Sequence, residues 1–344
     1  MKDFFNAYKG ELYKSTRKQT ILKLCIAIII VMILVTLVYS FMDSILESMG
    51  VSSNIQMPTF GSNEEAVQTL KEVIQEYEGR IARGEVKLNG VNNNQLYQYR
   101  AMLTKYEYLL ANGLSDSDFV DYGVFSGTNG ASYVVQIMQV LAEVIMFFAI
   151  IMCVKNYVGE LHSGTLKMQL LRPVSRSKTF TAKFLSIYTI SFCALLVFVI
   201  VSGVIGIIRF GADSAHILGV LDDSKVIILS PFAYIMTEFV GQAIKIFAVC
   251  QLTYFVSNLF KGRNTAIAVP IVILLLGSSV EGMLAYGYVG YVGFVSNFNF
   301  LTSLSINGPA FRGMKLWTML CICILWLAGM MTFNYLSFKN KDIN

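Results

Sequence analysis

Six apolar runs of about 20 residues divide this chain. They lie near residues 21–42, 132–154, 184–208, 228–256, 265–285 and 316–338. A helix of this length matches the hydrocarbon thickness of a bilayer. The 55% hydrophobic residues and the mean hydropathy of +0.58 also exceed what a soluble domain of this size carries. The sequence therefore predicts an all-α polytopic membrane protein with six transmembrane helices.

The segment after the fifth run stays apolar, but glycines interrupt it. They are Gly282, Gly287, Gly290 and Gly293. Irregular backbone at membrane depth is tolerated where protein or water surrounds it. We therefore expect a re-entrant segment at about 282–304, before the last span.

The distribution of Lys and Arg predicts the orientation of the chain. Basic residues dominate the N-terminal tail, the connector 155–183, the turn at Lys261 and Arg263, and the C-terminal tail, whereas acidic residues dominate 43–131. By the positive-inside rule, both termini of a multi-pass plasma-membrane protein are then cytoplasmic. The expected parts are residues 1–20, a first span at 21–42, an extracellular domain at 43–131 and five further spans within 132–344. The net charge of +5 follows this rule and does not indicate nucleic-acid binding.

Residues 1–20 combine an apolar stripe with a basic surface. The stripe contains Phe4, Phe5, Tyr8, Leu12 and Tyr13. The basic residues are Lys2, Lys9, Lys14 and Lys18. This pattern predicts a helix that lies in the membrane interface, and the alternative is a frayed basic tail.

Two stripes in the extracellular domain predict a helical hairpin. They are Val67, Leu70, Ile74, Tyr77 and Ile81, followed by Leu96, Tyr99, Leu103, Tyr106 and Leu110. Their spacing is that of helices packed face to face. Ser62 with Glu65 fits a capping box, and residues 89–94 contain turn-forming Asn and Gly. The hairpin is either a spacer or dimer contact, or a surface that recognises cargo or a partner.

Three ionisable residues fall inside predicted spans. They are Glu143, Glu238 and Lys245. A charge at the bilayer centre costs about 2.5 to 3.5 kcal/mol on insertion scales, so each needs a compensating contact. The three residues either line a polar pathway or interface, or Glu143 and Lys245 pair across two helices. Neither the six cysteines, which all lie in or beside apolar runs, nor the two histidines indicate a metal site.

The connector 155–183 is a polar, basic interruption between two spans. Leu161, Thr165 and Met168 share one face of a helix. Pro173 should end that helix, because a residue before proline avoids the helical conformation. The next helix would then begin near Ser175 or Ser177. This short amphipathic element suits the groove of a partner protein or a surface of anionic headgroups.

The connector resembles a known family. It contains E-x-x-x-G-T-L from Glu160, then R-P-x-S-R from Arg172, then Lys183 at the start of the next span. This pattern is similar to the cytoplasmic segment of permease subunits of type-2 ABC exporters. The resemblance implies that the segment holds a coupling helix which contacts an ATP-hydrolysing subunit. The contact region would comprise Glu160, Gly164, Thr165, Leu166, Arg172, Pro173, Ser175 and Arg176.

The resemblance also implies how such a chain works. The chain lacks the G-x-x-x-x-G-K-[ST] phosphate loop. ATP and Mg²⁺ are therefore expected in a separate nucleotide-binding ATPase. The chain itself is expected to be non-catalytic and free of cofactors and metals. Two permease copies, or two related permeases, would enclose the pathway within the membrane lipid. A first outer segment of this length occurs in bacterial members linked to antimicrobial-peptide resistance or ion export, so the cargo is expected to be a peptide, a lipid-like molecule or another amphipathic compound.

Two other classes of function stay open at the level of sequence. An ion-gradient-driven secondary transporter would use Glu143, Glu238 and Lys245 to carry protons or ions. Inverted repeats would favour that class, and none is evident in the sequence. A membrane sensor or scaffold would use the hairpin to bind a signal, although the cytoplasmic segments are too short for an output domain.

Overall fold

The structure is a computed structural model. It describes residues 2–16, 26, 29–30, 62–85, 90–115, 119, 130–170, 174–211, 216–221, 225–260, 262–284, 292–295, 297–298 and 316–340. In chain order the elements are α1 (Lys2–Ser15), α3 (Asn63–Ala82), α4 (Gly90–Asn112), α5 (Gly130–Val154), η2 (Lys155–Gly159), α6 (Glu160–His162), α7 (Thr165–Leu170), α8 (Arg176–Phe210), β1 (Ile217–Leu221), β2 (Lys225–Leu229), α9 (Pro231–Leu259), α10 (Arg263–Leu284) and α12 (Leu316–Asn340).

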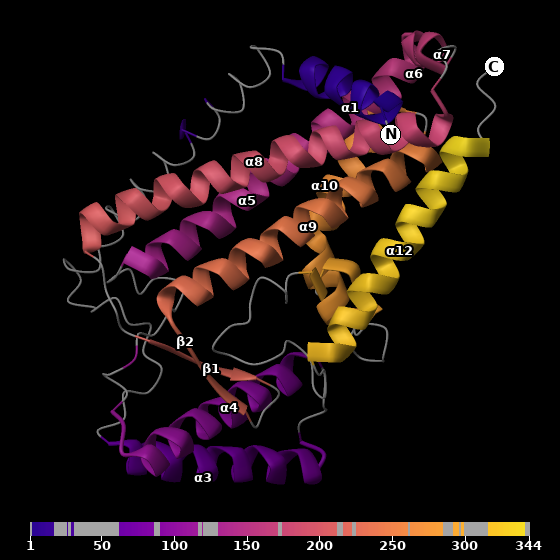
Figure 1. The fold of residues 1–344 in the computed structure, drawn as a ribbon. Coiled ribbons are helices and arrows are strands. Elements are labelled where there is room, and N and C mark those ends of the chain that lie inside the picture. Colours follow the sequence, from indigo (N-terminus) through magenta and orange to yellow (C-terminus); the bar gives the residue numbers. More distant parts are fainter. Residues whose placement is uncertain are drawn as a thin grey trace.

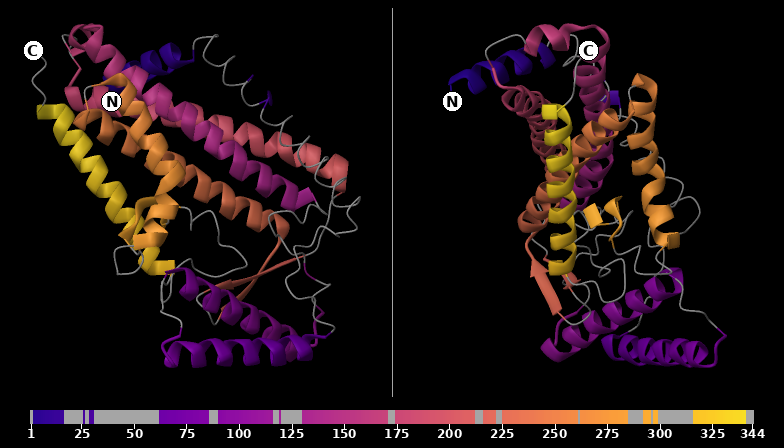
Figure 2. Two further views of the ribbon diagram at one scale, coloured as in Figure 1. Left: turned by 180° about the vertical axis from the view of Figure 1, so that it is seen from behind. Right: turned by 90° about the vertical axis from the view of Figure 1, so that its right-hand side faces the viewer.

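The long helices form a bundle with different elements at its two ends (Figure 1). α1, α6, α7 and the C-terminal end of α12 lie at one end, called here the connector end. The hairpin of α3 and α4 and the pair of strands lie at the opposite end, as the two further views also show (Figure 2). The sequence segments predicted to be cytoplasmic therefore gather at one end of the molecule.

Four of the described helices are long and apolar enough to cross a membrane. They run over 133–162, 176–209, 231–259 and 317–340. The apolar part of α10, 263–277, is shorter. The predicted first span at 21–42 falls almost wholly outside the described residues, as does most of the predicted re-entrant segment at 282–304. The structure thus supports a multi-pass helical protein, and the number of six spans stays a prediction.

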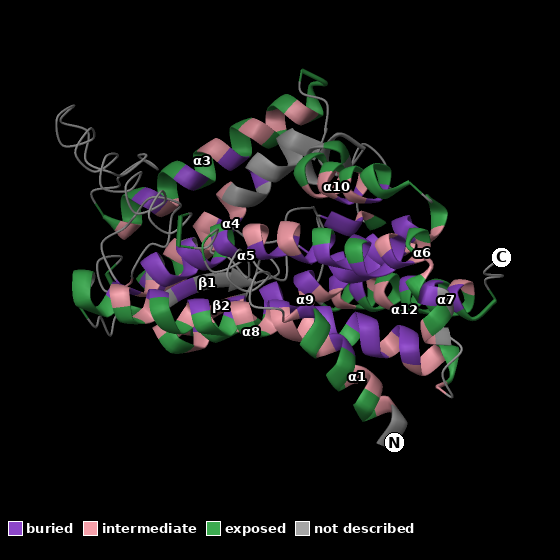
Figure 3. Cartoon of the chain, turned by 90° about the horizontal axis from the view of Figure 1, so that it is seen from above, coloured by how far each residue is buried: buried purple, intermediate pink, exposed green. Residues whose placement is uncertain are grey.

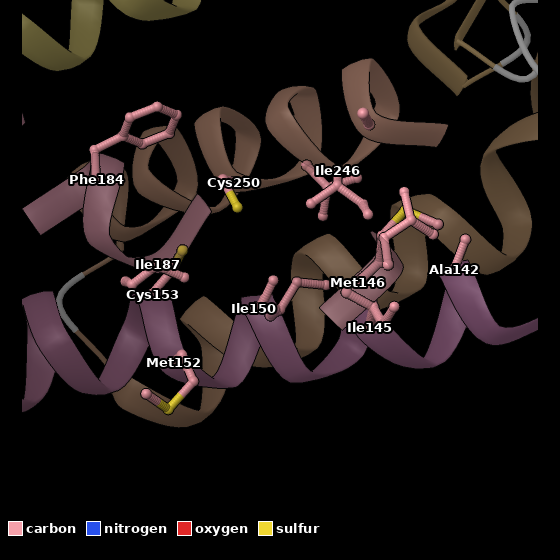
Figure 4. Packing of buried hydrophobic residues seen from close by; sticks show 14 of the residues in the cluster. Ala142, Ile145, Met146, Ile150, Met152, Cys153, Phe184, Ile187, Ile246 and Cys250 are labelled. Carbon is pink, nitrogen blue, oxygen red and sulfur yellow. The ribbon is translucent and has the colours of Figure 1, made fainter. Parts of the chain in front are cut away.

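The core lies where α5 packs against α8 and α9. Ile145, Met146 and Ile150 of α5 are fully buried there, and Cys153 of α5 and Cys250 of α9 lie in the same core (Figure 4). Cys323 is buried as well, whereas Cys193 and Cys321 are exposed. Seen from above, buried positions concentrate along α5 and α9, whereas much of α8 is exposed (Figure 3). Because lipid tails are as apolar as these side chains, the helices are held by close packing and polar contacts rather than by transfer from water.

Two packed helices occupy residues 64–111, where a hairpin is expected, and the place of this hairpin outside the membrane stays a prediction. α3 packs along α4, with Leu70 and Leu109 almost completely buried, and the Ser62 hydroxyl accepts a hydrogen bond from the Glu65 backbone N–H. The position expected for the turn is wrong, however. α4 already begins at Gly90, and α3 ends instead before Gly84, whose φ of 73° suits glycine.

The strands β1 and β2 correct the expectation of an all-α fold. They pair in antiparallel fashion, with Ile217 opposite Leu229, and both contact α4. The sequence V-I-I-L at 226–229 favours a strand because β-branched side chains suit extended backbone. The following helix begins only at Pro231, where the Ser230 hydroxyl accepts a hydrogen bond from the Ala233 N–H. The apolar run at 228–256 therefore contains the end of a strand and then a helix.

A close approach of two glycines joins α5 to α8 near the hairpin end. A Cβ atom added at Gly206 would lie 2.9 Å from the Gly130 carbonyl oxygen, which is a backbone atom and cannot rotate away. A Cβ atom added at Gly203, one turn earlier, would meet nothing within 4 Å. Small residues allow such helix approaches in membranes.

We expect Gly206→Ala to lower the free energy of unfolding by about 1–3 kcal/mol, because the methyl group forces α5 and α8 apart. Gly203→Ala is the matched control and should have no effect or raise stability slightly, since alanine favours helix. Thermal unfolding of the purified variants in one detergent would test this. Equal midpoints for the two variants would contradict the proposed contact.

Candidate functional site

The connector begins as a direct continuation of a membrane-spanning helix. α5 passes into the π-helical turn η2, and η2 passes into α6. A π turn inserts one extra residue into a helix and frequently marks a functional position. The side chains of Asn156, Tyr157 and Glu160 are all buried, so this stretch is packed between other elements.

A sharp corner follows at Ser163 and Gly164. Gly164 has a φ of 70°, a conformation that glycine adopts without strain. The hydroxyls of Ser163 and Thr165 both donate to the Glu160 carbonyl oxygen, at 3.3 and 3.4 Å. The corner therefore satisfies a carbonyl group that the end of α6 leaves free.

The short helix α7 follows the corner and shows two contrasting faces. Leu166 is buried in the main core, whereas 71% of Met168 is exposed. The expectation that Leu161, Thr165 and Met168 share a face of one helix is wrong, because the left-handed turn at Gly164 places Leu161 in α6 and the other two residues in α7. α7 is held in place by Leu166 and presents Met168 outward.

The second half of the connector joins α8 to α12. α8 begins at Arg176, in agreement with the prediction, and Ser175 is its N-cap residue. Arg176 donates to the Lys339 carbonyl oxygen at 3.3 Å, and the Ser177 hydroxyl donates to the Tyr335 hydroxyl at 3.0 Å. Arg172 and Pro173 lie outside the described residues.

A cluster of four charged side chains lies behind the corner, and it is called here the Lys183 cluster. The ammonium group of Lys183 contacts a Glu160 carboxylate oxygen at 2.5 Å and a Glu11 carboxylate oxygen at 3.0 Å. Glu160 also accepts a hydrogen bond from Lys14. Lys183 is fully buried and Glu160 is 5% exposed. The cluster therefore ties α1, α6 and α8 together through two positive and two negative charges.

α1 docks on the bundle through polar side chains. The Tyr8 hydroxyl donates to Thr189 at 2.9 Å, and the Ser15 hydroxyl accepts from Asn156 at 3.1 Å. Together with Glu11, these residues recur on one face of the helix. The expected single apolar stripe is therefore divided, because Phe5 and Tyr13 are 63% and 81% exposed on the other side. The position of α1 in a membrane interface stays a prediction.

Aromatic rings pack beneath the connector and join four elements. Tyr157 of η2 lies edge-on to Tyr254 of α9, with ring centroids 5.7 Å apart. Phe180 of α8 contacts both Tyr254 and Phe338 of α12, at 5.5 and 5.3 Å. Edge-on aromatic pairs are attractive beyond the area that they bury. A displacement of the connector would thus be transmitted to α8, α9 and α12.

A chain of polar contacts strengthens the same junction. The Tyr157 hydroxyl donates to Asn258, and the Asn258 amide donates to Asn334 of α12 at 3.2 Å. Asn334 in turn donates to the backbone and side-chain oxygens of Gln251, at 2.9 and 3.0 Å. Hydrogen bonds between helices of this kind contribute about 0.6 to 2 kcal/mol each in a membrane.

The ionisable residues inside the bundle form two separate contacts between α5 and α9. Lys245 donates to Glu143 at 2.6 Å, which is the pairing considered from the sequence. Glu238 accepts hydrogen bonds from Gln139 and Gln242, at 3.2 and 3.1 Å. Among the described residues, no cation lies within ion-pair distance of Glu238. Whether these groups also line a pathway stays a prediction.

Residues 5–343 match the family described as ABC-2 family transporter protein. The chain belongs to the ABC-2 family of transporter proteins. It is also similar to "Uncharacterized protein YhcI" of Bacillus subtilis (strain 168), with 23% identity over 201 residues, which are 57% of this chain and 64% of that protein. An ABC-2 protein is a membrane-spanning component of an ABC transporter, which agrees with the long apolar helices described above.

Sequence reasoning found some members of the site and missed others. It singled out Glu160, Gly164 and Lys183 as parts of one motif, but it did not pair Glu160 with Lys183. Glu11 and Lys14 were absent from the predicted site residues. A signal for Glu11 was present, because it is an acidic residue within a strongly basic tail. Within the described residues, no three potential metal ligands gather at one place.

The contact between Glu143 and Lys245 can be tested by exchanging the two charges. Lys245 is 6% exposed, whereas the Glu143 side chain is 41% exposed, so Glu143→Lys would place two positive charges together and lower stability by about 1–3 kcal/mol. We expect the double variant Glu143→Lys/Lys245→Glu to recover most of that loss in thermal unfolding. A double variant no more stable than the single one would show that the two residues do not depend on each other.

Proposed function

We propose that this chain is the permease subunit of an ATP-driven ABC exporter, and that its 155–183 segment receives movement from a separate ATPase subunit. Membership of the ABC-2 family supports this function over a secondary transporter or a sensor. The proposed complex contains two permease copies, or two related permeases, which enclose the pathway within the lipid bilayer.

The observation that carries the proposal is the corner followed by α7. α7 projects beyond the ends of the spans at the connector end (Figure 1). Its exposed Met168 is a flexible apolar side chain of the kind that fills grooves on partner proteins. The buried Leu166 connects the same short helix to the core. α7 thus has a free face for a partner and a fixed face toward the spans.

The residues assigned to the ATPase contact divide into two groups by exposure. Thr165, Ser175 and Arg176 are exposed and could touch a partner directly, and Gly164 shapes the corner. Glu160 and Leu166 are buried, so in this proposal they position the contact surface from behind. Their assignment rests on the resemblance and on this geometry together.

The arrangement of the two ends supports the proposed orientation. α1, the connector and the end of α12 lie together (Figure 2), and all three come from segments rich in Lys and Arg. We therefore place this end and both termini in the cytoplasm, and the hairpin outside the cell. Peptides, lipid-like molecules or other amphipathic compounds are the proposed cargo.

Met168 provides a direct test of the contact surface. Replacing it with Asp should reduce co-purification of the ATPase by about tenfold or more, because a charge would be buried in an apolar contact. Met168→Leu is the matched control and should retain the complex, since it keeps the volume and the apolar character. The measurement is the ATPase-to-permease ratio after purification from the native membrane. Full retention of the ATPase by Met168→Asp would overturn the proposed contact.

Deleting the hairpin tests whether the two ends of the molecule have separate roles. Deleting residues 64–111 should change cargo handling but leave ATPase binding intact, because the hairpin lies at the opposite end from α7. Replacing the exposed Glu72 and Glu76 with Gln is the milder variant. Transport and ATPase co-purification would be measured for both. If the deletion abolished assembly to the same extent as transport, the hairpin would have a structural role.

A further inference from the structure

Lys183 is held by two carboxylates that belong to different elements. Glu160 lies in α6, at the start of the corner, and Glu11 lies in α1. A contact whose only role was to fix the connector to α8 would need no carboxylate besides that of Glu160. The presence of a second carboxylate at 3.0 Å therefore calls for a separate explanation.

The explanation lies in the cost of an isolated buried charge. The Lys183 side chain is fully enclosed, and removing its counter-charge would leave an ammonium group in apolar surroundings. If Glu160 were its sole partner, any movement of the connector away from α8 would incur that penalty. With Glu11 present, Lys183 keeps a negative partner when Glu160 departs.

Glu11 also has unused capacity for hydrogen bonding. Its second carboxylate oxygen, Oε2, is buried and has no hydrogen-bond partner among the described residues. An ammonium group has three N–H donors. The N–H group of Lys183 that points at Glu160 could therefore turn to Oε2 of Glu11. Lys183 would then keep its full set of hydrogen bonds, and Oε2 would gain one.

Glu160 is likewise provided with a second partner. Lys14 contacts its other carboxylate oxygen, and 42% of the Lys14 side chain is exposed. A long, half-exposed lysine can follow a carboxylate over a short distance into water. Each member of the pair between Glu160 and Lys183 thus keeps an opposite charge after the pair separates.

We propose that the Lys183 cluster is a releasable latch, in which Glu11 is the positioning residue that takes over Lys183 when the connector moves. This inference rests on the proposed function, because the movement is that of a segment driven by the ATPase. In the closed latch, Glu160 holds the corner against α8. In the open latch, Lys183 stays with Glu11, and Glu160 stays with Lys14.

Two variants with the same chemistry distinguish a latch from a merely structural cluster. Glu160→Gln and Glu11→Gln each remove one carboxylate from Lys183. A structural cluster would loosen in both. A latch responds in opposite ways, because Glu160→Gln frees the connector, whereas Glu11→Gln leaves Glu160 as the only anion for Lys183 and holds the connector closed.

The experiment measures hydrogen exchange of residues 155–170 in the full chain in lipid nanodiscs without an ATPase. We expect exchange to rise about tenfold or more in Glu160→Gln, as local opening becomes easier, and to stay at or below the wild-type rate in Glu11→Gln. Lys14→Gln, which removes a half-exposed charge, should raise it less than Glu160→Gln. Exchange in Glu11→Gln that rises as in Glu160→Gln would overturn the latch.

A second measurement separates the latch from the proposed function. With the co-purified ATPase and a non-hydrolysable ATP analogue, exchange of 155–170 should change in the wild type and stay unchanged in Glu11→Gln. If the variants differ as expected but the analogue leaves the wild type unchanged, the latch is supported and the proposed coupling is overturned. If Glu11→Gln fails to fold, Lys183→Gln added to it should restore folding, and failure of that rescue would overturn the latch.

Discussion

A fully enclosed ammonium group needs carboxylates around it to offset the loss of water, and this requirement organises the connector end of the chain. Lys183 lies about two turns inside α8 and is fully buried within the protein. Its two anions come from positions 172 and 23 residues away. Glu11 and Glu160 compensate the positive charge of Lys183 only if α1 and α6 pack against α8. One buried charge therefore determines how three elements pack.

Polar contacts serve a related purpose deeper in the bundle. Apolar side chains gain little by leaving lipid for the protein interior, so apolar surface alone does not select a partner helix. The contact of Lys245 with Glu143 selects α5 as a neighbour of α9, and Asn334 does the same for α12. The close approach of Gly130 and Gly206 adds a geometric match between α5 and α8. Specificity in this bundle thus comes from a few polar and small residues among many apolar ones.

The fold could be predicted from the sequence where the pattern is local. Repeating apolar residues located α3 and α4, and runs of about 20 apolar residues located α5, α8, α9 and α12. The strand at 225–229 was missed because its apolar residues adjoin those of α9, and length alone could not divide them. The corner at Gly164 was missed because a single glycine does not reveal a left-handed conformation.

The candidate site depends on contacts that local patterns do not contain. The connector motif was recognisable, yet Glu160 was expected at a partner's surface and lies inside the chain. Its pairing with Lys183 joins two parts of the motif, but its contact with Lys14 joins residues 146 positions apart. Tertiary packing determines such pairs. In a single sequence they are indicated only by an isolated charge of the opposite sign, such as Glu11 in the basic N-terminal tail.

The two ends of the molecule differ in how firmly they are joined, and this difference bears on how movement could travel. At the connector end, charges, aromatic rings and amides link α1, α6, α8, α9 and α12. At the other end, the strands β1 and β2 lie between the bundle and the hairpin, and α4 contacts both strands and α10. A force applied to α7 would therefore move several spans together, whereas the hairpin is joined to those spans by fewer elements. Such an arrangement separates the hairpin from the connector, because the two surfaces share no direct contact among the described residues.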